Sequence, residues 1–532
     1  MAGLAWVAPG LLLMAGVRSS GAAAFRIGYV GGLAFYLGAL HWLLFIPLSF
    51  TPIIGWLCLA AYLAVYPGIW LWLCWKNYPT QAEPQSHQGT PGWHPKTSTQ
   101  FIELVDWFIA TPWFSRLAWA VFCAALWVGL EMIVGRLFTG FPWSFLGNSQ
   151  YRILQLVQIA SVTGVYGVSF LVVWFSVSLA GALVMLIRRP QVRWHAQREL
   201  LVPFMVTAAV VALGWQKVIR PVPPLPTVKL ALIQPSIPQT WIWDPKESNN
   251  RFRQLLELSE QALTNHPDLL VWPEAAVPYM FRLDEDIFAP VTNLVQTHKV
   301  WLVLGSDDGE VRTRPNGRIE TNFFNSSFLV APNGEVMGSY RKRRLVIFGE
   351  YIPFGRRFSF IEDFTGLGSF TPGDRPGWFS MPDLHIRASI LICFEDVFPH
   401  LTRTSVDDNT DFILNLTNNG WFGESAAQWQ HAAAAVFRAI ENGVPLVRCA
   451  NNGLTCWVDP EGGMHDVYFP GTTDIYGVGF KIVEVPLSGR QKLSPTFYHQ
   501  HGDWFGWGCL GLSAVVILWQ LRQQRRHTIA TV

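Results

Sequence analysis

The sequence predicts an α/β domain inserted into an α-helical transmembrane bundle. The chain has 532 residues, of which 50% are hydrophobic and only 14% are charged, a balance too apolar for an ordinary soluble protein. Long apolar runs fill its first two hundred residues and a stretch near the C-terminus, whereas short apolar runs alternate with helical patterns between about Thr227 and Gly489. The long runs are typical of membrane spans, and the short ones of a sheet covered on both faces.

Apolar windows of roughly 17 to 25 residues are long enough to cross a bilayer. A shorter run, residues 4–17, is either a cleaved signal peptide or a further helix; because no Lys or Arg precedes it, we favour a retained, tilted helix and about seven spans in all. The windows of full length are residues 27–48, 53–75, 117–138, 160–187, 200–215 and 504–521.

Basic residues predict how these spans are oriented. The densest basic stretches beside a span are residues 188–199 and 522–527, and Lys and Arg collect on the cytoplasmic side of a membrane. The intervening α/β domain, residues 219–499, is therefore expected outside the cytoplasm. The last span and its basic tail, residues 500–532, return the chain to the cytoplasm.

Two segments of unusual composition mark the domain organisation. Residues 221–226 read PVPPLP, a stiff spacer at the border between the helix bundle, residues 1–218, and the α/β domain. Residues 77–113 are rich in Pro, Gln, Ser and Thr, which predicts a flexible polar loop on the cytoplasmic side.

Within the α/β domain, short runs rich in Val, Ile, Leu and Phe predict strands. Two segments, 252–267 and 428–443, have helical spacing and stop at Pro or Gly. Asn333 and Gly334 between two apolar runs predict a tight hairpin turn. The predicted strands are residues 228–233, 269–272, 300–304, 327–331, 388–393, 412–416, 446–449 and 455–458.

Charge and cysteine usage exclude several classes of function. A net charge of +2 and the lack of a long basic run argue against nucleic acid as a partner. The seven cysteines show no CxxC pair and no ligand-spaced Cys/His cluster, so neither a disulfide framework nor a metal site is expected.

Glu274 and Cys393 both follow predicted buried strands, where α/β sheets build their sites. A Cys in an apolar run is more often a buried structural thiol than a nucleophile. This thiol, however, has carboxylates beside it and no His nearby in sequence, so a desolvated glutamate is the candidate base. Glu274 fits that role.

Lys342 lies in the basic run YRKRRL, which on charge alone predicts a solvated or headgroup-facing patch. The run passes directly into an apolar stretch, and Glu350 follows eight residues later. One lysine can therefore turn inward and stabilise an oxyanion. Carboxylate, amine and thiol together are the parts needed to make and break a thioester.

Ordered motifs carry a resemblance to a known family. WPE at 272–274, YRK at 340–342, FGEYIPFG at 348–355, ICFED at 392–396, NLTNNGWFG at 415–423 and WQH at 429–431 occur in that order, with LFTGFPW at 137–143 in the membrane part. The chain thus resembles the nitrilase superfamily and, with its flanking apolar spans, the membrane-bound apolipoprotein N-acyltransferases of bacteria. The resemblance covers most of the chain and implies an αββα sandwich as the catalytic domain.

The resemblance also implies roles for particular residues. It assigns a catalytic triad to Glu274, Lys342 and Cys393, and assistance in the transition state to Glu350 and Glu395. Residues implied to contact substrate are Trp243, Phe394, Trp421 and Phe422. The last two would gate lipid entry on a mobile loop, although a packed loop explains their sequence equally well.

The implied reaction is a two-step acyl transfer without cofactor or metal. Cys393 takes an acyl chain from a phospholipid donor as a thioester, and the amine of the diacylglyceryl-cysteine of an apolipoprotein then accepts it. The implied location is the bacterial inner membrane, with the catalytic domain in the periplasm and membrane lipid as a partner. A membrane-tethered amide hydrolase with the same triad is the alternative; an inactive transporter or scaffold would have no use for these motifs.

Some residues depart from the family pattern or raise separate questions. Phe394 stands where the family usually has Tyr, and Arg344 and Ile347 where it has His and Pro. The family generally has eight spans, against about seven here. Glu131 lies inside an apolar span, where a carboxylate is a functional candidate; an ion pair with Arg136 or a hydrogen bond within the bundle is the structural alternative.

Overall fold

A computed structural model describes residues 2–17, 19–79, 108, 110–188, 193–220, 224–242, 244–313, 319–352, 370–487 and 495–530. The chain divides into two compact units. The helical unit comprises Met1–His41, Ile53–Val218 and Asp503–Val532, and the α/β unit comprises Trp42–Pro52 and Ile219–Gly502. Most of the polar loop predicted at 77–113 lies outside the described residues.

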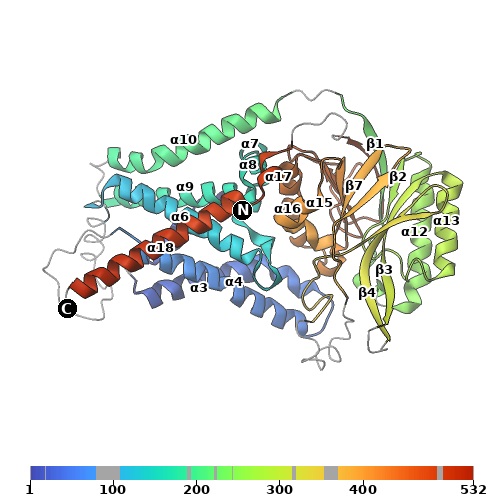
Figure 1. Ribbon diagram of the computed structural model, residues 1–532, viewed down its shortest axis with the longest axis horizontal. Coiled ribbons are helices and arrows are strands. Elements are labelled where there is room, and N and C mark those ends of the chain that lie inside the picture. Colours follow the sequence, from blue (N-terminus) through green and yellow to red (C-terminus); the bar gives the residue numbers. More distant parts are fainter. Residues whose placement is uncertain are drawn as a thin grey trace. The chain divides into compact units, whose positions relative to one another are not determined.

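Six helices of the described chain are long and apolar enough to cross a membrane (Figure 1). They carry little charge, and their apolar residues continue around the helix rather than along one stripe, as expected of helices that face lipid and each other. These helices are α3 (Gly21–Ala39), α4 (Thr51–Lys76), α6 (Trp113–Val134), α9 (Val165–Arg188), α10 (Arg193–Val218) and α18 (Trp504–Ala530).

Shorter helices join them: α1 (Ala2–Ala5), α2 (Ala8–Ala15), η2 (Leu137–Thr139), η3 (Pro142–Ser144), η4 (Leu146–Gln150), α7 (Leu154–Val157) and α8 (Ala160–Thr163). The retained helix predicted at 4–17 is wrong as a single helix, because a turn at Trp6 and Val7 separates α1 from α2. Neither piece is long enough to cross a bilayer.

Two other predicted spans are shorter than their apolar composition suggested. In the span predicted at 27–48 the α-helix ends at Ala39, and only a short 3-10 helix follows. The span predicted at 160–187 is interrupted by Gly164, whose φ of +66° is a conformation that favours glycine and ends α8. Composition alone does not distinguish an apolar helix from an apolar loop.

Polar contacts tie the helices of this unit together. Arg116 on α6 forms a buried ion pair with Glu199 on α10, with the guanidinium nitrogen 2.7 Å from the carboxylate oxygen. The indole N–H of Trp70 donates to the carbonyl of Cys123, and that of Trp119 to the carbonyl of Cys74, both at 2.8 Å. In an apolar surrounding each donor needs such a partner, so these contacts fix how the helices pack.

The α/β unit contains two six-stranded sheets. The first has the order β12-β1-β2-β3-β4-β5 and the second β11-β10-β9-β8-β7-β6. Strands of the first sheet are β1 (Thr227–Gln234), β2 (Leu269–Val271), β3 (Trp301–Thr313), β4 (Ile319–Val330), β5 (Val336–Arg341) and β12 (Gly479–Pro486). Strands of the second are β6 (Gly377–Met381), β7 (Ile386–Ile392), β8 (Phe412–Thr417), β9 (Leu446–Ala450), β10 (Cys456–Val458) and β11 (Met464–His465).

The sheets pack face to face between two layers of helices (Figure 1). Along β1, Leu230 and Leu232 point into the core between the sheets, whereas Ala231 and Ile233 point to the helices outside. This alternation explains why the strand reads as one continuous apolar run. The helices are α11 (Gln239–Ile242), η6 (Pro245–Glu247), α12 (Ser248–Leu263), α13 (Glu285–His298), η7 (Cys393–Val397), α15 (Pro399–Ser405), η8 (Asn419–Phe422), α16 (Ala427–Asn442) and α17 (Phe497–His501).

All eight strands expected from the sequence are present, and so are the two helices and the hairpin. The hairpin joins β4 and β5 as an antiparallel pair, with Gly334 at φ +85° in its turn. Strands β6, β11 and β12 were not predicted from the sequence. They lie at or near sheet edges, where strands are less apolar and give a weaker signal.

A segment between α3 and α4 belongs to the α/β unit. It begins in the short helix η1 (His41–Phe45), and the indole N–H of Trp42 donates to Gln430 on α16 at 2.9 Å. The ring of Trp42 also packs on Phe422, with ring centres 4.5 Å apart. Part of the predicted span 27–48 therefore covers a globular surface instead of crossing a bilayer.

Gly305 in β3 allows a close approach that the fold requires. A Cβ at this position would lie 2.4 Å from the carbonyl oxygen of Pro273 and 2.8 Å from the Cα of Glu274.

Gly305→Ala is expected to destabilise the unit by about 1–3 kcal/mol through overpacking, seen as a lower melting temperature by tryptophan fluorescence in detergent. Gly338→Ala in β5 is the control, since its Cβ meets only the ring of Phe379 at 3.6 Å; equal losses in both variants would contradict the close-approach argument.

Candidate active site

A buried lysine between two carboxylates lies at the centre of the candidate site. Lys342 follows β5 and is 1% exposed. Its Nζ donates to Oε1 of Glu274 at 3.0 Å and to Oε1 of Glu350 at 2.7 Å. Nδ2 of Asn325 donates to the same two oxygens, at 2.8 and 2.9 Å. The inward orientation expected for one lysine of the basic run is therefore observed.

The neighbouring carboxylates settle the protonation of this lysine. Burial alone would lower the pKa of Lys342, but the negative charges of Glu274 and Glu350 raise it well above its usual value. The amine is therefore an ammonium at neutral pH and cannot act as a base. It can only donate hydrogen bonds and supply positive charge.

Glu274 reaches the site from the carboxyl end of β2. Its second oxygen, Oε2, accepts a hydrogen bond from the backbone N–H of Asn418 at 2.8 Å. Asn418 directly follows β8 of the second sheet, so one carboxylate joins the ends of strands from both sheets. Glu274 is 6% exposed, and this buried position depends on the donors around it.

Cys393 is the first residue of η7, at the sharp turn that follows β7. Its φ is +54°, in the left-handed region that a residue with a Cβ occupies at a cost of roughly 1–3 kcal/mol. Such strain persists only where the surroundings hold it. The turn leaves the residue partly buried.

The Cys393 thiol lies within the electrostatic reach of both Glu274 and Lys342. Burial and the charge of Glu274 raise its pKa to about 12, against a smaller lowering by the ammonium of Lys342. The resting sulfur therefore carries its proton, and the carboxylate of Glu274 lies near enough to receive it. This arrangement suits general-base activation at the moment of attack.

Glu395 connects the turn of Cys393 to the segment of Lys342. One of its oxygens accepts from the backbone N–H groups of Arg343 and Arg344, at 2.7 and 3.1 Å. The other accepts from the Tyr340 hydroxyl and the backbone N–H of Ile392, at 2.7 and 2.8 Å. Burial raises the pKa of Glu395, although these donors oppose the shift. With four donors engaged, the carboxylate positions the amine and the thiol relative to each other.

A second buried cluster holds the carbonyl of Cys393. Nδ2 of Asn415 and Nε2 of His431 lie 3.1 and 3.2 Å from this oxygen, and both also contact the carboxylate of Asp396, at 2.6 Å. Arg448 completes the cluster through an ion pair with Asp396. Burial would raise the pKa of Asp396, but His431 and Arg448 hold it below its usual value. Charged and polar side chains thus hold the backbone carbonyl of the strained residue.

Aromatic residues expected to contact substrate lie on two turns. Phe394 packs edge-on against Phe398, with ring centres 5.0 Å apart. Trp421 and Phe422 lie on η8 and are partly exposed. Phe422 packs on Trp42. In this structure its ring is therefore packed, as the alternative to a mobile gate predicted. Trp243 lies outside the described residues.

The sequence did not single out several residues of this site. Asn325 lies within β4, whose sequence IETNFFNSSFLV contains several other polar residues, so no local signal marked it. Asn418 and His431 belong to the NLTNNGWFG and WQH motifs, but nothing in their spacing shows that they contact Glu274 and Cys393. Only the fold brings these strand ends together.

Comparisons with known proteins match both units. Residues 1–178 match the apolipoprotein N-acyltransferase N-terminal domain, and residues 229–471 match the carbon-nitrogen hydrolase family. The apolipoprotein N-acyltransferase of Geobacter metallireducens is 34% identical over 549 residues, covering 98% of this chain and 92% of the relative. Those of Chlorobaculum tepidum and Shewanella oneidensis are 31% and 32% identical, covering 74% and 67% of this chain and 75% and 67% of the relatives.

The chain belongs to the apolipoprotein N-acyltransferase family. Together with its six apolar helices, this membership makes it a multi-pass membrane protein. The carbon-nitrogen hydrolase match agrees with the two packed sheets, so the predicted nitrilase-like sandwich is confirmed. Among solved structures, an amidase of the nitrilase superfamily from Nesterenkonia AN1 has a TM-score of 0.37 and 18% identity, covering 53% of this chain and 95% of that one.

The pKa of Cys393 gives a direct test of the partner assigned to it. Since the charge of Glu274 raises this pKa, Glu274→Gln should lower it and increase the thiolate fraction at any pH below it. Alkylation of Cys393 by iodoacetamide at pH 8 should become roughly three- to fourfold faster for each pKa unit lost, because the tenfold larger thiolate fraction is partly offset by the lower nucleophilicity of a less basic sulfur. Peptide mass spectrometry measures the rate at this residue alone.

Glu335→Gln provides the matched control, because Glu335 is exposed on the β4–β5 hairpin. Its alkylation rate should equal that of the wild type. An unchanged or slower rate in Glu274→Gln would show that the carboxylate does not raise the pKa of the thiol.

Proposed function

We propose that the protein transfers a fatty acyl chain from a phospholipid to the N-terminal amine of the diacylglyceryl-cysteine of an apolipoprotein. The observation that carries the proposal is the grouping of a strained cysteine, a carboxylate and a buried ammonium in a membrane-bound member of this family. Glu274, Lys342 and Cys393 are its catalytic triad. The reaction needs no cofactor and no metal.

In the first step Cys393 takes the acyl chain. Its thiol proton moves to the carboxylate of Glu274 as the sulfur attacks the carbonyl carbon of the phospholipid ester. The bond from that carbon to the glycerol oxygen breaks, and the proton on Glu274 passes to this oxygen. The products are a lysophospholipid and an acyl thioester on Cys393.

In the second step the neutral amine of the apolipoprotein attacks the thioester carbon. Glu274 takes a proton from the attacking nitrogen, the carbon–sulfur bond breaks, and the proton returns to the sulfur. An amide forms and the thiol is regenerated. Because the same carboxylate accepts and returns a proton in each half, the enzyme ends as it began.

Lys342 supplies positive charge to both tetrahedral intermediates. An ammonium buried between fixed partners costs little reorganisation when negative charge develops on the carbonyl oxygen. Glu350 supports this role because it holds Nζ at 2.7 Å. Glu395 supports it indirectly by tying the segment after Lys342 to the turn of the nucleophile.

Both substrates are lipids, and this explains a catalytic domain joined to a membrane unit. We assign the chain to the bacterial inner membrane, with the α/β unit in the periplasm, from its basic flanks at 188–199 and 522–527. Trp243, Phe394, Trp421 and Phe422 are proposed to contact the acyl chains. For the partly exposed pair on η8, release of Phe422 from Trp42 would open this contact.

The thioester is the intermediate to detect. Purified protein in detergent is incubated with phospholipid and measured by intact mass spectrometry. The wild type and Cys58→Ala, which removes an exposed cysteine, should gain the mass of a fatty acyl group, and Cys393→Ala should not. Adding a diacylglyceryl-cysteine peptide should remove the adduct and leave the peptide acylated.

Two results would contradict the proposal. A folded wild-type protein without an adduct would exclude phospholipid as the donor. An adduct that releases only free fatty acid, with the peptide unmodified, would favour the membrane-tethered hydrolase instead.

A further inference from the structure

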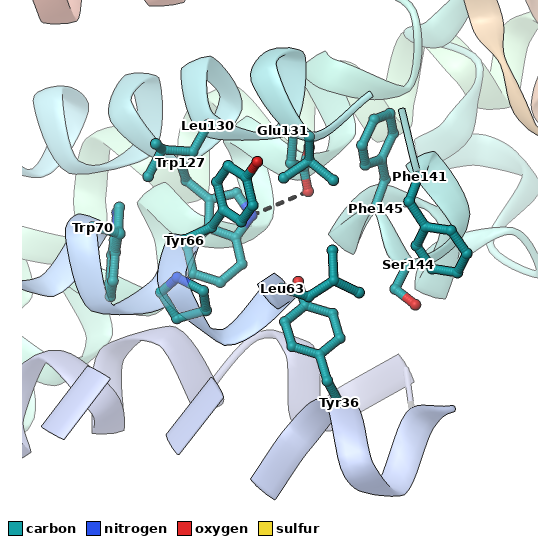
Figure 2. Close-up of a pocket in the computed structure, with 12 residues that line it drawn as sticks. Tyr36, Leu63, Tyr66, Trp70, Trp127, Leu130, Glu131, Phe141, Ser144 and Phe145 are labelled. Atoms are coloured by element: carbon teal, nitrogen blue, oxygen red, sulfur yellow. Dashed lines mark hydrogen bonds between the residues drawn. The ribbon is translucent and has the colours of Figure 1, made fainter. Parts of the chain in front are cut away.

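A pocket inside the helical unit contains a buried carboxylate that the reaction does not use. Glu131 on α6 is 8% exposed and lines a pocket within this unit (Figure 2). The expected ion pair with Arg136 does not form, because Arg136 pairs with Asp503 instead. The hydrogen-bond alternative is observed for one oxygen only.

The two oxygens of this carboxylate have different surroundings. Oε1 accepts from the indole N–H of Trp127 at 3.0 Å and from the backbone N–H of Leu146 at 2.8 Å. Oε2 has no hydrogen-bond partner within the described residues. The Ser169 hydroxyl lies within hydrogen-bonding reach of the carboxylate, and its oxygen accepts from the backbone N–H of Gly147 at 2.8 Å. One oxygen therefore anchors the side chain and the other is left for a ligand.

The lining of the pocket has the composition of a cation site. Its other polar groups are hydroxyls, from two tyrosines and a serine, and none of its side chains is basic. Aromatic rings surround the space beside the carboxylate (Figure 2), and their faces attract a cation. The pocket is lined by Tyr36, Leu63, Tyr66, Pro67, Trp70, Trp127, Leu130, Glu131, Val134, Phe141, Ser144 and Phe145.

We propose that this pocket binds a primary ammonium group through Oε2 of Glu131. A buried carboxylate is costly unless a cation or enough donors satisfy it, and the lining offers aromatic faces but no cation of its own. A primary ammonium has three N–H donors, which suits one carboxylate oxygen and neighbouring hydroxyls better than a quaternary ammonium does. The ligand class follows from these groups alone.

Two substrates of the proposed reaction carry this chemistry. One is a phospholipid donor with an ethanolamine headgroup, and the other is the amine of the apolipoprotein acceptor. The choice of either substrate as the source of the ammonium rests on the proposed function. Binding of an ammonium at Glu131 does not rest on it, so the proposed function and the ammonium site can fail separately.

Glu131→Gln tests the site with little change of shape. The amide oxygen can still accept from Trp127 and Leu146, whereas the amide nitrogen replaces Oε2 and repels an ammonium. Native mass spectrometry of the full-length protein compares phosphatidylethanolamine with phosphatidylglycerol of the same acyl chains. A wild-type preference for the ethanolamine lipid that falls at least about fivefold in Glu131→Gln, a change of roughly 1 kcal/mol, supports the lipid as the source.

A second arm tests the acceptor. Here phosphatidylglycerol is the donor, and the KM for a diacylglyceryl-cysteine peptide is measured. A KM that rises fivefold in Glu131→Gln, while the headgroup preference stays unchanged, supports the acceptor amine as the ligand. If neither quantity changes in a folded Glu131→Gln protein, the ammonium site is overturned. A wild type that transfers no acyl chain but keeps the headgroup preference would refute the proposed reaction and leave the site standing.

Met132→Leu is the matched control. Met132 is the next residue on α6 and fully buried, and this volume-conserving change leaves the carboxylate in place. The control should match the wild type in both arms. Equal losses in Met132→Leu and Glu131→Gln would assign the effect to helix packing and overturn the ammonium site.

Discussion

The buried ammonium of Lys342 is the feature on which the active site depends. A charge removed from water requires opposite charge and hydrogen bonds at close range, and Glu274 and Glu350 supply both. Removal of one partner from such a buried charge typically lowers the free energy of unfolding by about 3–5 kcal/mol, which is a large part of the stability of a domain. The positions of β2, β5 and the segment to Glu350 are therefore coupled through one nitrogen atom.

This coupling extends to Cys393 through two carboxylates, each of which contacts more than one segment of the site. Glu274 contacts the end of β8 as well as Lys342, and Glu395 joins the segment after Lys342 to the turn of Cys393. Behind that turn, Asp396 and His431 hold the carbonyl of the strained residue. The two sheets thus meet at a set of fixed charges, and the Cys393 thiol, which we propose as the nucleophile, lies among them.

The sequence identified the parts of this site that follow strong local patterns. Glu274 and Cys393 each follow a nearly continuous apolar strand, and Lys342 follows a hairpin strand, so their places could be expected before the fold was known. Asn325, Asp396 and His431 could not, because their roles depend on contacts between segments far apart in the chain. For the same reason the segment from Trp42 to Leu48 was expected in a membrane span: its apolar residues suit lipid and a protein surface equally well.

The central claim is that Cys393 rests as a thiol whose proton is ready to move to Glu274. Difference infrared spectroscopy of the wild type minus Cys393→Ser at neutral pH measures this directly, because the S–H stretch of this residue appears alone in the difference. We predict an S–H band shifted by a hydrogen bond to the carboxylate of Glu274, and a further change of that band in Glu274→Gln. The lack of any S–H band assigned to Cys393 would mean a resting thiolate, which would contradict the role given to Glu274.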